Sequence, residues 1–198
     1  EKKTPPFIIV GLPHGGAARM SEYLPADAIA ARPAGERYVQ FLVSQIKPRV
    51  ERAFRVETDP KKVAVGGSSL GAAIALEAAL THPEQFGMVL AESLPLETGK
   101  ADAWRTWIDE RLAKAASGRM LPSRVYLGFG GHEAGKDPSV KDENTRIAAD
   151  VAELESKLIA AGVSKGSVHV TLDEQAEHTE SAWAERLPGA LQFLFGGV

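Results

Sequence analysis

A serine stands between two glycines in Gly67-Ser68-Ser69-Leu70-Gly71, which has the pattern G-x-S-x-G. An apolar run precedes this segment and an Ala-rich helical segment follows it. That context is typical of a nucleophile elbow, a sharp strand-to-helix turn that lifts the serine hydroxyl clear of the sheet. Ser69 is therefore the candidate nucleophile, and the backbone N–H of Leu70 is the candidate donor to an oxyanion. Gly67 and Gly71 are expected to keep side chains out of the crowded turn. The alternative is a glycine-rich turn without a catalytic role.

The same glycines do not fit the two common phosphate-binding loops. A P-loop needs a lysine after its glycines, and no lysine follows here. A dinucleotide fingerprint needs G-x-G-x-x-G, but with Gly66 as its first glycine the third position is Ser68. Both patterns are excluded at this turn.

A serine nucleophile needs a base, and the base needs an acid to orient it. Where the serine lies in an elbow of this kind, the chain order is serine, acid, histidine, each after a strand. Glu133 follows the apolar run 124–128, and His178 follows the alternating run 167–172. His178 is therefore the candidate base and Glu133 the candidate acid. Asp137 and Asp142 are reserve acids, and the alternatives are a solvated carboxylate and an exposed loop histidine.

Short apolar runs alternate with helical patterns along the whole chain. Strands are predicted at 7–11, 62–66, 86–91, 124–128 and 167–172, and helices at 36–54 with a break at Pro48, 70–80, 101–116, 144–161 with Gly162 as its cap, and 181–195 with Pro188 inside. This alternation predicts an α/β fold, a mostly parallel sheet with helices on both faces, in a single domain over residues 1–198. Ligands on such sheets bind at the carboxyl ends of the strands.

The composition of the 198 residues excludes several classes of protein. Apolar residues make up 44% and the net charge is −3, so no electrostatic binding of nucleic acid is expected. No apolar run approaches the roughly 18–20 residues that a membrane span needs. The absence of cysteine excludes disulfides and a cysteine nucleophile, and it suits the cytoplasm and the periplasm equally. The five histidines show no ligand spacing such as H-x-x-x-H, so no metal and no cofactor are expected.

Three further residues are candidates for lining a substrate pocket. His14 opens His14-Gly15-Gly16 after the first predicted strand, Ser68 precedes the candidate nucleophile, and Trp104 follows the third predicted strand. For Trp104 the favoured alternative is ordinary core packing. Trp183, five residues after His178, is expected to anchor the last helix and so to fix the histidine loop.

Four motifs resemble the putative esterase family of α/β-hydrolases. They are Val10–Gly16 with Arg19–Pro25, Gly66–Gly71, Phe86-Gly87 with Glu92–Pro95, and Glu177–Trp183 with Arg186-Leu187-Pro188. The family includes siderophore and enterobactin esterases, feruloyl esterases and the esterase D-like S-formylglutathione hydrolases. The resemblance implies that Ser69 is the nucleophile, His178 the base and Glu133 the acid.

The resemblance also implies strands before Phe7 that this chain does not contain, one of which carries a second oxyanion donor in the family. The expected function is a serine carboxylic-ester hydrolase that acts on siderophore-type, aryl or short-chain esters. The alternatives are a catalytically impaired fragment or binding module, and an acyltransferase that uses the same residues. The expected partners are a small-molecule ester and a second copy or another segment that covers an exposed sheet edge.

Overall fold

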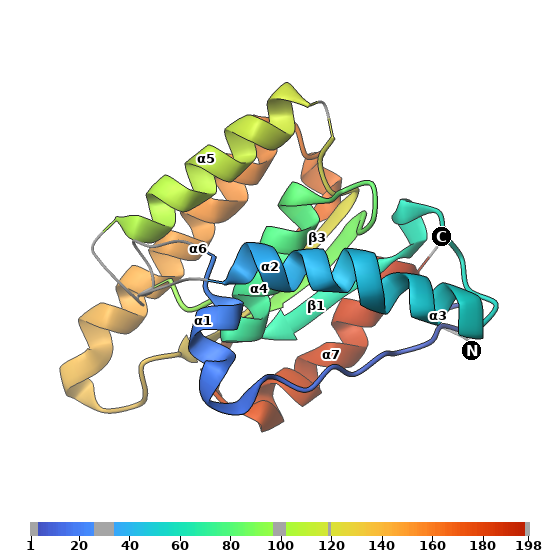
Figure 1. The fold of residues 1–198 in the computed structure, drawn as a ribbon. Helices are drawn as coiled ribbons and strands as arrows, with labels where there is room; N and C mark the ends of the chain where they lie inside the picture. The colour runs from blue at the N-terminus through green and yellow to red at the C-terminus, as the bar shows by residue number, and fades with distance from the viewer. Residues whose placement is uncertain (1–3, 26–33, 97–101, 119, 197–198) are drawn as a thin grey trace.

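The computed structural model describes residues 4–25, 34–96, 102–118 and 120–196. Four strands form one parallel sheet in the order β1 (Ala64–Ser68), β2 (Met88–Glu92), β3 (Arg124–His132) and β4 (Val168–Glu177). The carboxyl ends of all four strands therefore lie along the same edge of the sheet. The predicted α/β fold with a parallel sheet is confirmed (Figure 1).

Helices cover both faces of this sheet (Figure 1). In chain order they are η1 (Gly16–Ala18), α1 (Arg19–Tyr23), α2 (Gly35–Phe41), η2 (Leu42–Ile46), α3 (Lys47–Ala53), η3 (Pro60–Lys62), α4 (Leu70–Thr81), α5 (Ala103–Ser117), η4 (Pro138–Val140), α6 (Lys141–Ala161), η5 (Lys165–Ser167) and α7 (Glu180–Phe195). Gly162 ends α6 with a φ of 117°, as its predicted role as a cap requires.

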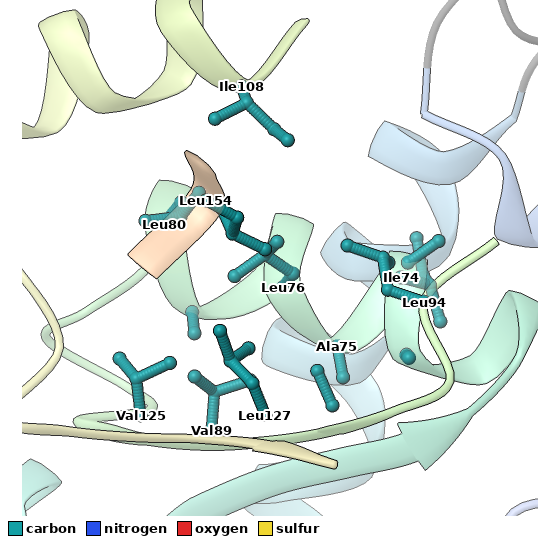
Figure 2. Close-up of a cluster of buried hydrophobic side chains, with 14 of the residues drawn as sticks. Ile74, Ala75, Leu76, Leu80, Val89, Leu94, Ile108, Val125, Leu127 and Leu154 are labelled. Atoms are coloured by element: carbon teal, nitrogen blue, oxygen red, sulfur yellow. The ribbon is translucent and has the colours of Figure 1, made fainter. Parts of the chain in front are cut away.

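The larger core lies between the sheet and α4, α5 and α6. Figure 2 shows Val89, Val125 and Leu127 of the sheet facing Leu76 of α4, with Ile108 of α5 beyond. Of the eleven residues from Leu70 to Leu80 in α4, all except Gly71 are buried. The alanines of this helix allow close packing on the sheet. A smaller core on the other face joins α7 to Met88, Leu90 and Tyr126.

The predicted strand 7–11 is wrong. The structure assigns this segment no strand, and its side chains are exposed, with Ile9 at 71%. Phe7 stacks on Phe195 at the end of α7, with ring centroids 5.1 Å apart. An apolar run becomes a strand only when a neighbour supplies the hydrogen-bond ladder. β1 is the edge strand on its side of the sheet, and no described segment pairs with its outer edge.

The predicted helix 36–54 is divided before Pro48 rather than at it. α2 passes into the π-helical turn η2, and α3 then carries Pro48 in its first turn. Proline donates no hydrogen bond, and its ring crowds the carbonyl four residues earlier, here that of Ser44 within η2. The wider π turn relieves this contact without ending the helical path.

Candidate active site

Ser69 occupies a strained turn between β1 and α4. Its φ of 56° and ψ of −126° are rare for any residue except glycine, and such strain is characteristic of functional turns. The Ser69 N–H donates to the Glu92 carbonyl at 2.8 Å, which ties the turn to the end of the neighbouring strand β2. A Cβ atom at Gly67 would lie 2.5 Å from the carbonyl of Gly71, so only glycine fits there. At Gly71 itself a Cβ would meet nothing within 4 Å, which differs from the crowding expected at that position.

The first turn of α4 presents donors beside Ser69. The Ser69 carbonyl accepts from the N–H groups of Ala72 and Ala73, at 2.9 and 3.3 Å. Within the described residues, no hydrogen bond uses the Leu70 N–H or the Ser69 hydroxyl. Both groups are therefore available to a ligand at the N-terminus of a helix, where developing negative charge is favoured.

His178 and Glu133 are joined by a hydrogen bond. His178 Nδ1 lies 2.7 Å from Glu133 Oε2, although 45 residues separate the two in the chain. The Glu133 side chain is only 5% exposed, whereas that of His178 is 31% exposed and accessible to a substrate. A carboxylate can accept hydrogen bonds but cannot donate them. Nδ1 of His178 therefore carries the proton, and Nε2 keeps its lone pair free to act as a base.

Three donors converge on the Glu133 carboxylate. Besides His178, the Gly130 N–H donates to Oε1 at 2.6 Å and the Ser93 hydroxyl donates to Oε1 at 2.7 Å. Burial by itself raises the pKa of this carboxyl, but the hydrogen bonds from His178, Gly130 and Ser93 outweigh it and lower the pKa below the ordinary value. Glu133 is therefore an anion at neutral pH.

Ser93 is a site residue that the sequence analysis did not single out. It is 1% exposed, follows the last residue of β2 and has a φ of 50°. Its hydroxyl accepts from Trp183 Nε1 at 2.9 Å. Its position two residues after the predicted strand 86–91 is the signal that the sequence offers, because residues just past a strand reach the carboxyl edge of the sheet.

A buried ion pair lies beside the site on the α7 face. Arg186 Nε donates to Glu92 Oε2 at 2.9 Å, and Nη2 lies 2.8 Å from the same oxygen. Gly128 leaves room for this carboxylate, since a Cβ there would lie 2.3 Å from Glu92 Oε2. Burial raises the pKa of Glu92, and the Arg186 guanidinium opposes that rise. The pair fixes α7, which follows His178, against the end of β2.

The three residues expected to line a pocket differ in where they lie and in how far they are buried. Ser68 is half-buried at the end of β1 beside Ser69. His14 is exposed, and its Nδ1 accepts from the Gly16 N–H at 3.0 Å. Trp104 is 3% exposed and packs edge-on against Trp107 in the larger core, which agrees with the core-packing alternative.

The reserve acids lie elsewhere. Asp137 is exposed and accepts from the Ser139 N–H at the start of η4, and Asp142 is exposed in the first turn of α6. In the described part of the chain, neither is hydrogen-bonded to His178.

Other binding features are few. Across residues 4–25, 34–96, 102–118 and 120–196, no group of three or more His, Cys, Asp or Glu side chains is arranged to hold a metal ion, and no helix could span a membrane. An open hollow lies over α2 and η2, away from the elbow. Its lining residues are Glu36, Arg37, Gln40, Phe41, Ser44 and Gln45.

Comparison with solved structures gives the fold of this chain. The siderophore hydrolase EstA from Aspergillus nidulans is 23% identical with a TM-score of 0.69, over 89% of this chain and 65% of that one. The BES protein from Bacillus cereus is 18% identical with a TM-score of 0.68, over 91% and 64%. The enterobactin esterase FES from Shigella flexneri, solved with 2,3-di-hydroxy-N-benzoyl-serine, is 20% identical with a TM-score of 0.60, over 90% and 40%. The chain thus spans 40% to 65% of the length of these three proteins.

Comparison with sequences gives the family. A search of the curated proteins found no match. The family model described as "Putative esterase" matches residues 1–194, which is nearly the whole chain. The resemblance found in the four motifs is confirmed, and the chain belongs to the putative esterase family.

Proposed function

We propose that this chain carries a serine carboxylic-ester hydrolase centre in which Ser69 is the nucleophile, His178 the base and Glu133 the acid. The observation that carries the proposal is the 2.7 Å hydrogen bond between His178 Nδ1 and Glu133 Oε2, at the sheet edge where the strained Ser69 turn also lies. That bond leaves Nε2 as the free basic nitrogen. Membership of an esterase family agrees with the reaction.

A chain of contacts supports the approach of the histidine loop to Ser69, although β1 and β4 are the outer strands of the sheet. The Trp183–Ser93 hydrogen bond brings the start of α7 across β3 to the end of β2. Ser93 directly follows Glu92, whose carbonyl accepts from the Ser69 N–H. The loop that carries His178 therefore reaches the strand next to the elbow.

The reaction follows from these positions. His178 Nε2 takes the proton from Ser69 Oγ as this oxygen attacks the ester carbonyl, and the Leu70 N–H stabilises the oxyanion of the tetrahedral intermediate. The intermediate collapses as His178 protonates the leaving alcohol, and an acyl-enzyme on Ser69 remains. Water, deprotonated by His178, then releases the acid. Glu133 holds the imidazole in the required tautomer and stabilises its charged form.

The substrates proposed are siderophore-type, aryl or short-chain esters. Two of the similar structures are named as a siderophore hydrolase and an enterobactin esterase, which supports the choice of these esters for assays. His178 acts as the base only in its neutral form.

The experiment is hydrolysis of short p-nitrophenyl esters and labelling by a fluorophosphonate. Ser69→Ala should lose both, since removal of the nucleophile of a serine hydrolase costs on the order of 10⁶ in kcat. His178→Gln should lose hydrolysis, while His169→Gln, at an exposed position earlier on β4, should keep it. Ser156→Ala, an exposed serine of α6, is the control for labelling. Undiminished hydrolysis by Ser69→Ala, or no labelling of an active wild type, refutes the proposal.

A further inference from the structure

Trp183, Ser93, Glu133 and His178 form a closed ring of contacts. Trp183 Nε1 donates to Ser93 Oγ at 2.9 Å, and Ser93 Oγ donates to Glu133 Oε1 at 2.7 Å. Glu133 Oε2 lies 2.7 Å from His178 Nδ1. The ring closes because the His178 imidazole packs edge-on against the Trp183 indole, with centroids 5.2 Å apart and planes at 83°. These contacts, called here the Trp–Ser–Glu–His ring, join the ends of β2, β3 and β4 to α7.

The hydrogen bonds of this ring have only one direction. An indole N–H donates and cannot accept, so Ser93 Oγ must accept from Trp183. The single hydroxyl proton of Ser93 is then free to go to Glu133. Glu133 Oε1 takes this bond together with the one from the Gly130 N–H. The other oxygen, Oε2, is left for His178, and the carboxylate has no freedom to turn.

The backbone of Ser93 is strained in order to make this contact. A φ of 50° is unfavourable for a serine, and the conformation is held by the Ser93 N–H, which donates to the Gly128 carbonyl at 2.7 Å. The side chain is almost fully buried, so its hydroxyl has no access to water. Strained, buried polar residues of this kind persist where the surrounding structure fixes them for a function.

We propose that Ser93 and Trp183 are positioning residues that hold Glu133 ionised and oriented toward His178 Nδ1. The inference rests on the proposed function and extends it to two residues that touch no reacting atom. Ser93 acts by donating to the carboxylate. Trp183 acts twice, because its N–H orients the Ser93 hydroxyl and its ring packs against the imidazole in an edge-to-face contact.

Two substitutions separate these roles from folding. Ser93→Gly removes the hydroxyl and tolerates the positive φ, while Trp183→Phe keeps an aromatic ring beside His178 and removes the donor. Ser93→Gly should lower kcat about 10- to 100-fold, with KM changed less than about twofold, because a hydrogen bond to a charged group is lost. Trp183→Phe should lower kcat by about 3- to 10-fold, since the hydroxyl can still reach Glu133 but is no longer oriented.

The pH profile distinguishes positioning from a loss of folded protein. With one donor fewer, the pKa of Glu133 rises and its carboxylate favours a protonated partner more strongly. The acid limb of the kcat/KM profile should therefore move to higher pH in Ser93→Gly. Partial unfolding, in contrast, lowers kcat/KM at every pH and does not move the acid limb of its profile.

Matched controls come from the same kinds of contact far from the ring. Ser123→Ala removes a serine hydroxyl that donates to the Gly87 carbonyl at 2.7 Å, and Trp107→Phe removes an indole that donates to buried Glu77 at 3.0 Å. Both variants should lose some stability, but the acid limb of their kcat/KM profiles should lie at the same pH as that of the wild type.

Proton NMR tests the inference without any substrate. The downfield proton of the His178–Glu133 hydrogen bond, identified by its loss in His178→Gln, should broaden or shift in Ser93→Gly and persist in Ser123→Ala. An unchanged limb and an unchanged resonance in Ser93→Gly overturn the inference and leave the proposed function standing. Full activity of Ser69→Ala and His178→Gln overturns the proposed function instead.

Discussion

Replacement of Arg186 by leucine should leave the Glu92 carboxylate buried, without a positive partner, under α7. The side chains of Glu92 and Arg186 are 3% and 4% exposed, and both guanidinium contacts go to one oxygen, Oε2. Glu92 Oε1 is buried without a hydrogen-bond partner. No other described cation is within salt-bridge distance of Glu92, so nothing replaces the lost charge.

The loss of unfolding free energy depends on whether the unpaired Glu92 carboxyl stays charged or takes up a proton. A buried charge that loses its partner costs about 3–5 kcal/mol. Protonation avoids this, and at pH 7 it costs about 3.4 kcal/mol from the ordinary pKa of 4.5, at 1.36 kcal/mol per unit. Arg186→Leu should therefore lose about 3–3.5 kcal/mol of unfolding free energy at pH 7.

The pH dependence of this loss is the sharper test. In the folded variant Glu92 binds a proton that the unfolded chain, with its ordinary pKa of 4.5, releases. The stability of the variant then rises as the pH falls, and its loss relative to wild type should shrink between pH 7 and 5.5. The slope should be at most about 1.4 kcal/mol per pH unit, because burial raises the pKa of Glu92 in the wild type as well. Urea denaturation at pH 7.0, 6.25 and 5.5 measures it.

The control is Arg124→Leu. Arg124 Nη1 donates to the carbonyls of Phe193, Leu194 and Gly196 at the end of α7, at 2.7 to 3.0 Å. Its removal leaves no carboxylate behind, so its loss of stability should be the same at each pH. A loss below about 1 kcal/mol for Arg186→Leu at pH 7, or one as flat with pH as that of Arg124→Leu, refutes the reasoning.

Two further predictions concern the elbow and the N-terminal segment. Gly67→Ala should abolish fluorophosphonate labelling and cost about 1–3 kcal/mol in urea denaturation, because its Cβ would collide with Gly71, whereas Gly71→Ala should keep both labelling and stability. Equal damage by the two substitutions would contradict this geometry. Ile9→Ser should change the unfolding free energy by less than about 0.5 kcal/mol, since Ile9 is largely exposed. A loss of about 2 kcal/mol or more would instead indicate the buried strand that the sequence predicts.

Local patterns were enough to predict Ser69, Glu133 and His178 as candidates, but not Ser93. The elbow is a local structure, so Ser69 and the start of α4 could be located from five consecutive residues. Glu133 and His178 could be chosen because parallel strands bring their carboxyl ends to one edge, and the structure joins the two side chains. Trp183 was expected to fix the histidine loop, and it contacts His178 directly.

Contacts between distant segments could not be predicted in this way. Arg186 and Glu92 are 94 residues apart, and Trp183 and Ser93 are 90 apart. No periodicity relates such pairs, because their meeting depends on how α7 packs across the sheet. The strand prediction at 7–11 was wrong for a similar reason. The apolar pattern favoured a strand, but a strand also needs a neighbouring strand to pair with, and that depends on the tertiary structure.

The sequence by itself therefore indicated the strand–helix alternation from residue 62 onward, the parallel sheet, and Ser69, Glu133 and His178 as candidate site residues, because the apolar patterns and motifs behind these predictions lie in short stretches of the chain. Only the tertiary structure decided which oxygen of Glu133 faces His178 and which way the Ser93 proton points. It also decided how α7 is held by Arg186 and that residues 7–11 lie outside the sheet. The physical reason is that hydrogen bonds and ion pairs act over a few ångströms, and the folded chain alone brings their partners within that distance.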